Sequence, residues 1–447
     1  MTAVPPSASA LPPGAFYVNG FSFFNAVSFQ IILGAPVILF AKSLGASSLV
    51  LGIIASLTPL LTILQLVAAR FLHRVGYRRF ILAGWGTRTL FTLAVAVLPV
   101  WPPLAPGARL YILIAALFGF NLLRGLASGA WLPWLTALIP EGGRGRFLSR
   151  DQAFMHAGCL VALIVSAWVM SGSVEAWEYT AVFSLGVGAA MASLWFIKRV
   201  PDVNSPEELR RSAVRVPWGA MLRFPPFARL LGFSLLYMFV AGGLGVFTIE
   251  FLVVHEKFSE GAVLLLSALA FVGALAGLAV AGPAIDRTGS KPWLRHTLAL
   301  LGVVVAGWWA IAAGVLPGWP ALVGTLNFFG GVSGAVFGLA STRTVMSSVP
   351  RMGRNHFFAL FTVVTSLGLG GAPVAWGAML DSVGTLEIAW PLFLLNRYSI
   401  YFGVLIPLVL AARSLVRRLH DGGSSTHHEI FEQQLTLRIG VPGMCED

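Results

Sequence analysis

Residues 282–292 read GPAIDRTGSKP and join two long apolar segments of the chain. Residues 69–79, which stand 213 positions earlier, read ARFLHRVGYRR and also join two apolar segments. Both turns are basic, and both have a glycine at the same place, Gly76 in the first and Gly289 in the second, followed two positions later by arginine or lysine. Glycine permits the tight turn that each connection needs. A turn that returns in this form predicts a duplicated architecture.

The composition is that of a membrane protein. The 447 residues are 57% hydrophobic and 11% charged, and the mean hydropathy is +0.82. A soluble protein of this length needs far more charge to cover its surface. Repeated apolar runs of about 18 or more residues indicate membrane-spanning helices, so a lipid bilayer is the expected surroundings. The net charge of +12 comes mostly from short loops, so it reflects membrane topology, and no nucleic-acid partner is expected.

The apolar runs predict twelve membrane-spanning helices in an all-α polytopic protein. The expected spans are 16–40, 48–70, 79–100, 109–138, 152–172, 178–198, 229–254, 261–284, 296–315, 319–345, 356–380 and 391–413. A charged, proline-rich stretch separates the sixth span from the seventh and predicts a linker between two six-helix bundles. The predicted division is an N-terminal segment 1–15, a bundle 16–198, a linker 199–228, a second bundle 229–414 and a tail 415–447.

The loops differ in charge between the two sides of the predicted spans. Loops on the side of the 69–79 turn carry most of the lysines and arginines, whereas the opposite loops carry only Lys42, Arg109 and Lys257. The positive-inside rule therefore places both termini and the linker in the cytoplasm. The residues up to Gly14 include no lysine or arginine and so lack the basic start of a cleavable signal peptide. We expect the first span to remain as an anchor in a cytoplasmic (inner) membrane.

A second pair of loops repeats at nearly the same offset. Residues 140–147 read PEGGRGRF, and residues 350–357, 210 positions later, read PRMGRNHF, so that Pro, Gly, Arg and Phe coincide. Parallel repeats of six helices with a binding site between them describe one large class of transporters. Basic, glycine-containing loops occur in any polytopic protein, but the order and spacing of both pairs agree, which favours a true repeat.

The pattern G-x-x-x-D-R-x-G-x-K in residues 282–291 resembles the signature loop of the major facilitator superfamily of secondary transporters. The earlier turn has Ala69 and His73 where Gly and Asp would stand. In the family this loop helps to hold one conformation closed while the two halves rock, so the resemblance implies a conformational latch, altered in the first half. The alternative is a loop that only signals topology. The expected latch residues are His73, Arg74, Gly76, Arg78, Gly282, Asp286, Arg287, Gly289, Lys291, Arg144 and Arg354.

Arg124 is the most informative charged residue within a predicted span. Asn121, Arg124, Ser128 and Trp131 stand at spacings of 3, 4 and 3 and so share one helical face. A guanidinium near mid-membrane should face water or an anion rather than lipid. Residues 124–130, RGLASGA, are similar in part to the superfamily's fourth-helix pattern R-x-x-Q-G-x-G. We expect Asn121, Arg124 and Trp131 to bind substrate or a counter-ion; the alternative is a structural arginine bonded to carbonyls and to Asn121.

Acidic residues are scarce within the predicted spans. Glu250, late in the seventh, is the clearest, and it is either a proton carrier or a water-facing carboxylate near the outer boundary. His156, early in the fifth span, is either a second titratable group or a structural residue at a helix end. Arg397, in the twelfth, either binds substrate or pairs with a carboxylate such as Asp381.

Two further arginines, Arg88 and Arg343, are expected to reach the cytoplasmic surface by snorkelling. The first predicted span carries a polar stripe at spacings of three, made of Asn19, Ser22, Asn25 and Ser28. In the superfamily the first, fourth, seventh and tenth helices line the central cavity. The resemblance therefore implies that four residues converge there: Asn25, Arg124, Glu250 and Asn327.

These features together predict a monomeric secondary active transporter, a symporter or an antiporter. It would move a small organic solute, anionic or zwitterionic because basic residues outnumber acids within the spans, and a proton would be the coupling ion. The alternatives are an efflux antiporter for amphipathic drugs, which the missing Gly-Pro-rich pattern of the fifth span disfavours, and a non-transporting scaffold or sensor of the same fold. No catalytic motif is visible, so we expect neither an enzyme nor a cofactor. The paired His427 and His428 fit a solvated tail better than a metal site.

Overall fold

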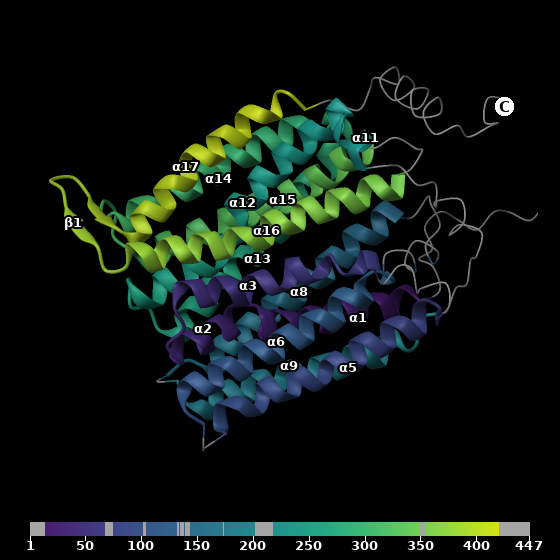
Figure 1. Cartoon of the computed structure of the whole chain (residues 1–447), viewed down its shortest axis with the longest axis horizontal. Coiled ribbons are helices and arrows are strands. Elements are labelled where there is room, and N and C mark those ends of the chain that lie inside the picture. Colours follow the sequence, from purple (N-terminus) through teal and green to yellow (C-terminus); the bar gives the residue numbers. More distant parts are fainter. Residues whose placement is uncertain are drawn as a thin grey trace, which may run out of the picture.

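The computed structural model describes residues 14–67, 75–101, 104–131, 134, 138, 144–172, 174–201, 218–348 and 354–419. Long helices lie side by side, as Figure 1 shows. In the first half they are α1 (Ala15–Leu33), α2 (Ala35–Ser43), α3 (Ser48–Thr62), α5 (Tyr77–Val97), the short 3-10 helix η1 (Leu98–Val100), α6 (Pro106–Ser128), α8 (Arg144–Val169) and α9 (Ala176–Ile197). In the second half they are α11 (Trp218–Leu222), α12 (Pro225–Val254), α13 (Glu260–Thr288), α14 (Ser290–Ala312), α15 (Pro320–Ser348), α16 (Arg354–Val383) and α17 (Arg397–Val416), with strands β1 (Glu387–Ala389) and β2 (Leu394–Asn396).

Twelve helical segments within the described residues are long and apolar enough to cross a membrane. Their outer faces carry large apolar side chains, of which Tyr111 and Trp168 are each 78% exposed. Such faces suit contact with lipid, because they would be costly in water. The prediction of an all-α protein with twelve spans is confirmed.

Several predicted boundaries were wrong. The first span is broken at Gly34, because Pro36 starts a new helix and cannot donate a backbone hydrogen bond to the preceding turn. The fourth helix ends at Ser128 instead of 138. The seventh begins at Pro225, inside the stretch expected to be a linker.

The predicted start of the last span was also wrong. Residues 387–396 form an antiparallel hairpin in which Glu387 pairs with Asn396. Helix α17 then begins because the Asn396 side chain accepts hydrogen bonds from the backbone N–H groups of Tyr398 and Ser399. This cap satisfies donors that the first turn of a helix leaves free.

The helices of each half pack mainly with one another. In the first half α1 packs against α8 and α9, and α5 packs against α6 and α9; in the second half α12 packs against α16, and α14 against α15 and α17. The two halves meet mainly along two helix pairs, α3 with α16 and α8 with α13, with smaller contacts of α2 and α3 with α12. We call the end that carries β1, β2 and the turns at 44–47 and 255–259 the hairpin end, and the opposite end the linker end (Figure 1).

The two signature turns have the same geometry. Gly76 and Gly289 have φ of +81° and +79° with extended ψ, a conformation that in practice only glycine adopts. Arg78 donates to the carbonyl of Lys198 at the end of α9, and Lys291 donates to the carbonyl of Leu419 just after α17, at 3.0 Å. Each basic residue therefore binds the end of the last helix of its own half, where the helix dipole favours a cation.

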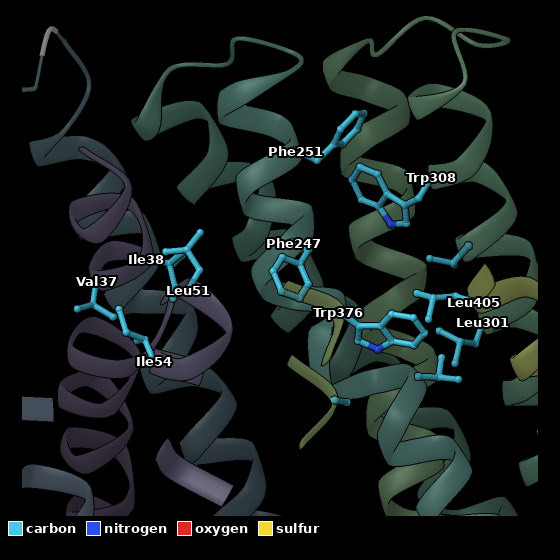
Figure 2. Close-up of a cluster of buried hydrophobic side chains, with 14 of the residues drawn as sticks. Val37, Ile38, Leu51, Ile54, Phe247, Phe251, Leu301, Trp308, Trp376 and Leu405 are labelled. Atoms are coloured by element: carbon cyan, nitrogen blue, oxygen red, sulfur yellow. The ribbon is translucent and has the colours of Figure 1, made fainter. Parts of the chain in front are cut away.

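One large apolar cluster extends through both halves. Figure 2 shows Val37, Ile38, Leu51 and Ile54 of α2 and α3 on one side, and Phe247 and Phe251 of α12 with Trp308 and Trp376 on the other. A second, smaller cluster lies near the linker end of the first half, around Phe21, Trp85, Ala127 and Trp134. This smaller cluster borders the polar groups described next.

Candidate functional site

Arg88 of α5 is buried inside the first half. The residue is only 3% exposed, and its guanidinium donates a hydrogen bond to the Asn25 side-chain oxygen on α1. The ring centres of Trp85 and Phe120 each lie 5.1 Å from the guanidinium carbon. The expectation that Arg88 snorkels to the surface was wrong, because Asn25 and the two rings hold the charge inside the bundle.

Arg124 of α6 lies close to Arg88. Its Nη1 is 3.4 Å from the Thr62 hydroxyl of α3, and its guanidinium carbon is 4.7 Å from the centre of the Phe29 ring of α1. The two arginines are near enough to repel each other electrostatically. Helices α3 and α6 can approach this closely because residue 125 is a glycine, since a Cβ there would collide with the Leu61 carbonyl.

Asn121 lies on the same face of α6, one turn from Arg124. It is fully buried, accepts a hydrogen bond from the Thr58 hydroxyl at 2.9 Å and donates to the Leu117 carbonyl. Thr58 and Thr62 are one turn apart on α3, so Asn121 and Arg124 meet matching hydroxyls. The shared face predicted for these two residues is observed.

The arginines have no acidic partner in the described part of the chain. The ion pairs found there are those of Glu250 with Lys42 and with Arg397. Among the described residues Trp85 Nε1, beside Arg88, has no hydrogen-bond partner, and neither do Asn19 Oδ1 and Ser28 Oγ elsewhere on α1. We call Asn25, Arg88 and Arg124, with the rings around them, the arginine site. Its spare positive charge and spare hydrogen-bonding groups suit a polar, anionic ligand.

Trp131 extends the aromatic border of this site. Its ring centre lies 4.9 Å from that of Phe21 and 5.7 Å from that of Trp85, and Trp85 stacks on Phe21. Trp131 therefore belongs to the Arg88 side of the site and is not shown in contact with Arg124.

Glu250 lies at the hairpin end, away from the arginine site. It is 1% exposed, and its Oε1 is 2.8 Å from Lys42 Nζ, 2.8 Å from the Ser48 hydroxyl and 3.6 Å from Arg397 Nη2. Lys42 and Ser48 belong to the first half and Arg397 to the second. The carboxylate therefore bridges the two halves.

Asp381 of α16 supports the same junction. Its carboxylate accepts hydrogen bonds from the backbone N–H groups of Ser48 and Leu49 at 3.0 and 2.9 Å. These groups start α3, where a negative charge is favoured. Of the two roles left open for Arg397, the ion pair is observed, with Glu250 in place of Asp381. We call Lys42, Ser48, Glu250, Asp381 and Arg397 the hairpin-end cluster.

The remaining candidates are spread over the molecule. Asn327 donates to the Val323 carbonyl of its own helix at 3.1 Å, and no hydrogen bond or ion pair joins it or Glu250 to the arginine site within the described residues. His156 of α8 packs its ring 5.9 Å from that of Phe271 on α13, across the junction of the halves. Of the four residues expected to converge, only Asn25 and Arg124 lie at one site.

The latch prediction is only partly covered. His73 and Arg74 lie outside the described residues, as do the side chains of Arg144, Asp286 and Arg354. Arg287 is exposed, and a side chain at Gly282 would meet nothing within 4 Å.

One buried acid escaped the sequence reading. Asp151 of α8 is 5% exposed and accepts a hydrogen bond from the Ser22 hydroxyl of α1. The fifth span was expected to begin at 152, which left Asp151 in a loop, whereas α8 begins at Arg144. The signal that pointed to it was the polar stripe of α1, since Ser22 and Asn25 both face buried charges.

Comparison with known proteins identifies the fold. The sequence model of the Major Facilitator Superfamily matches residues 19–373. No curated protein matches the chain by sequence.

Solved structures of transporters resemble the chain over nearly its whole length. A D-xylose–proton symporter superimposes with a TM-score of 0.70 at 14% identity, covering 92% of this chain and 98% of that chain. The xylose transporter XylE from E. coli, in an inward open conformation, gives 0.70 at 16%, covering 94% and 98%. The nucleoside transporter NupG gives 0.62 at 12%, covering 90% and 99%.

Proposed function

Since the chain belongs to the Major Facilitator Superfamily and is a membrane transporter, we propose that it carries a small organic anion or zwitterion bound at the arginine site. Members of this superfamily are carriers rather than enzymes. The observation that supports the proposal is the pair Arg88 and Arg124, which has no carboxylate partner among the described residues. A charge inside a membrane protein is costly unless it is paired, so a cationic pair of this kind favours an anionic ligand.

The surroundings of the pair support a ligand that is polar at one end and flat or apolar elsewhere. Trp85 Nε1, beside Arg88, is a buried donor without a partner among the described residues. The rings of Phe29, Trp85 and Phe120 hold the guanidinium groups by cation–π contacts. A carboxylate ligand can accept from the guanidinium groups in a bidentate fashion, and a zwitterion can also use the side-chain oxygen of Asn25.

The access route follows from the packing of the two halves. The hydrogen bonds and ion pairs that join the halves between described residues lie at the hairpin end: those of the hairpin-end cluster and that of Tyr179 with Glu260. This arrangement supports a conformation closed at the hairpin end. Alternating access would then proceed by rocking of the halves about α3–α16 and α8–α13.

The orientation that we propose places the linker end in the cytoplasm of an inner membrane, with both termini on that side. Most of the basic loop residues belong to loops on this side, whereas the opposite loops carry only Lys42, Arg109 and Lys257, a difference that the positive-inside rule associates with the cytoplasm. Exposed tryptophans at the hairpin end, Trp101, Trp177, Trp319 and Trp390, support a membrane–water boundary there. We further propose that the carrier acts as a monomer. We also propose that transport is coupled to protons, because the structures that it resembles in fold include a D-xylose–proton symporter.

The test begins with the purified chain and a panel of lactate, succinate, benzoate and glutamate. A bound ligand raises the thermal unfolding midpoint by mass action, and uptake of the same compounds is then measured in liposomes. We expect Arg124→Ala and Arg124→Lys both to lower uptake by about tenfold or more, because lysine keeps the charge but lacks the planar fork.

The control is Arg417→Ala, which removes an exposed arginine at the end of α17. This variant should transport at the wild-type rate, and all three should keep the wild-type elution profile in detergent. Full transport by both Arg124 variants would remove Arg124 from the binding site.

A further inference from the structure

Asp151 is held by a neutral partner alone. Its carboxylate lies between α8 and α1 and accepts a hydrogen bond from the Ser22 hydroxyl, and no lysine, arginine or histidine forms an ion pair or hydrogen bond with it in the described part of the chain. A carboxylate buried without a cation loses its hydration and regains little, so the neutral acid is favoured there.

The other acids of the spans have different surroundings. Glu250 has two cations and a hydroxyl, and Asp381 has two backbone N–H groups. Glu260 meets the Tyr179 hydroxyl at the hairpin end and is partly exposed. Glu178 caps the start of its own helix by accepting from the backbone of Glu175. Each of these carboxylates is stabilised as an anion or reaches water, whereas Asp151 has neither kind of stabilisation.

The charged and titratable groups near α8 leave Asp151 unpaired. Helix α1 has no acidic or basic residue and one tyrosine, Tyr17, which packs on Phe16. On α8 itself the exposed Arg150 lies over Phe154, His156 faces Phe271 and Cys159 faces the Ala26 carbonyl. The charged groups of α13 and α9 with described side chains stand at the helix ends: Glu260, Arg287, Glu178, Lys198 and Arg199.

We propose that Asp151 is the proton-binding carboxyl through which transport is coupled to protons, an inference that rests on the proposed function. In the step, a proton from water binds a carboxylate oxygen of Asp151 and converts the anion into the neutral acid, and the reverse step releases it. The Ser22 hydroxyl both donates and accepts, so it satisfies the carboxylate and the acid alike. Glu250 cannot change in this way without leaving Lys42 and Arg397 unpaired.

The position of Asp151 connects the proton to both the ligand and the rocking motion. Ser22 and Asn25 stand three residues apart on α1, about 4.5 Å along the helix axis, and Asn25 binds Arg88 of the arginine site. Helix α8 packs against α1 on one side and against α13 of the other half on another. A change of charge at Asp151 therefore acts on the seam between α1 and the helix that contacts the opposite half.

The first experiment measures protonation directly, by infrared spectroscopy of the full-length protein in lipid as the pH is varied. We expect the carbonyl band of a protonated carboxylic acid to appear as the pH falls, to vanish in Asp151→Asn, and to persist in Asp151→Glu, Ser22→Ala and Glu250→Gln. A band that Asp151→Asn leaves unchanged would overturn the proposal. So would a band that disappears in Glu250→Gln but not in Asp151→Asn.

The second experiment measures coupling in liposomes that contain a pH-sensitive dye, with the panel of lactate, succinate, benzoate and glutamate as probes. We expect the wild type to move protons with its anion, and Asp151→Asn to retain anion exchange while losing proton movement. Proton movement by Asp151→Asn at the wild-type rate would refute the coupling role. A wild type that moves none of the four probes would refute the proposed function instead, and the infrared result would still decide whether Asp151 binds the proton.

Discussion

Single charged residues within the spans take different roles according to the partners that reach them. Arg88 and Arg124 have rings, an asparagine and a threonine around them but no acid among the described residues. Glu250 has Lys42 and Arg397. An unpaired buried charge requires a ligand or a proton, whereas a paired one holds structure together. The first kind therefore marks the proposed site, and the second lies at the junction of the halves.

The Glu250 pair gives a prediction at this scale. Glu250→Gln keeps the size and the hydrogen bond from Ser48 but removes the charge that holds Lys42 and Arg397. We expect a loss of about 2 kcal/mol of stability, the range for hydrogen bonds to charged groups, because both cations are partly exposed and regain water. The decrease in the thermal unfolding midpoint in detergent measures this loss of stability.

The matched control for that variant is Glu387→Gln, since Glu387 is an exposed acid of β1 at the same end. It should leave the midpoint unchanged. Equal midpoints for Glu250→Gln and the wild type would mean that the buried pair contributes no net stability, as happens when desolvation offsets attraction.

At the scale of elements, the signature turns act first as ends of helices. Gly289 ends α13 and starts α14, and Gly76 starts α5, with the same positive φ. Arg78 and Lys291 then fasten the start of the new helix to the end of the last helix of their half. In the described part of the chain, the hydrogen bonds of these turns therefore connect helices within one half. Their role as a latch between the halves stays a prediction.

Substituting the turn glycine tests this reading. Gly289→Ala forces a side chain into a conformation that only glycine adopts, so we expect a loss of about 1–3 kcal/mol and a lower unfolding midpoint. Gly282→Ala, seven residues earlier in the same motif, is the control, because its new Cβ would meet nothing within 4 Å and alanine favours a helix. If both variants unfold at the same temperature, the positive φ of Gly289 costs nothing and the turn argument is wrong.

At the scale of the whole molecule, the two halves are closed against each other at the hairpin end. Small residues make this closure possible: a Cβ at Gly377 of α16 would lie 2.4 Å from the Ser48 carbonyl of α3, and one at Gly52 of α3 would lie 2.2 Å from the Pro373 carbonyl. The hairpin-end cluster then adds charge to a junction made by close backbone contact. Opening this end requires the charged groups of the hairpin-end cluster and the closely packed backbones of α3 and α16 to separate.

A wedge at the junction should therefore shift the carrier towards a conformation open at the hairpin end. We expect Gly377→Val to lengthen the distance between spin labels at positions 101 and 316, one in each half at that end, in a background in which Cys159 and Cys445 are serine. Gly371→Val on the same helix is the control, since a Cβ there would meet nothing within 4 Å. Identical distance distributions for wild type and Gly377→Val would show that close packing at this end does not set the conformation.

The sequence by itself determined the twelve spans, the duplicated turns and most of the polar residues worth inspecting. A helix that spans a bilayer must be long and apolar, and a turn with positive φ favours glycine. Spans and turns can therefore be recognised from short stretches of sequence. Only the tertiary structure decided which polar groups meet. Ser22 and Asp151 are 129 residues apart, Asn25 and Arg88 are 63 apart, and Lys42 and Glu250 are 208 apart. Helical periodicity tells which face of a helix a residue occupies, but the neighbour opposite that face is chosen by packing.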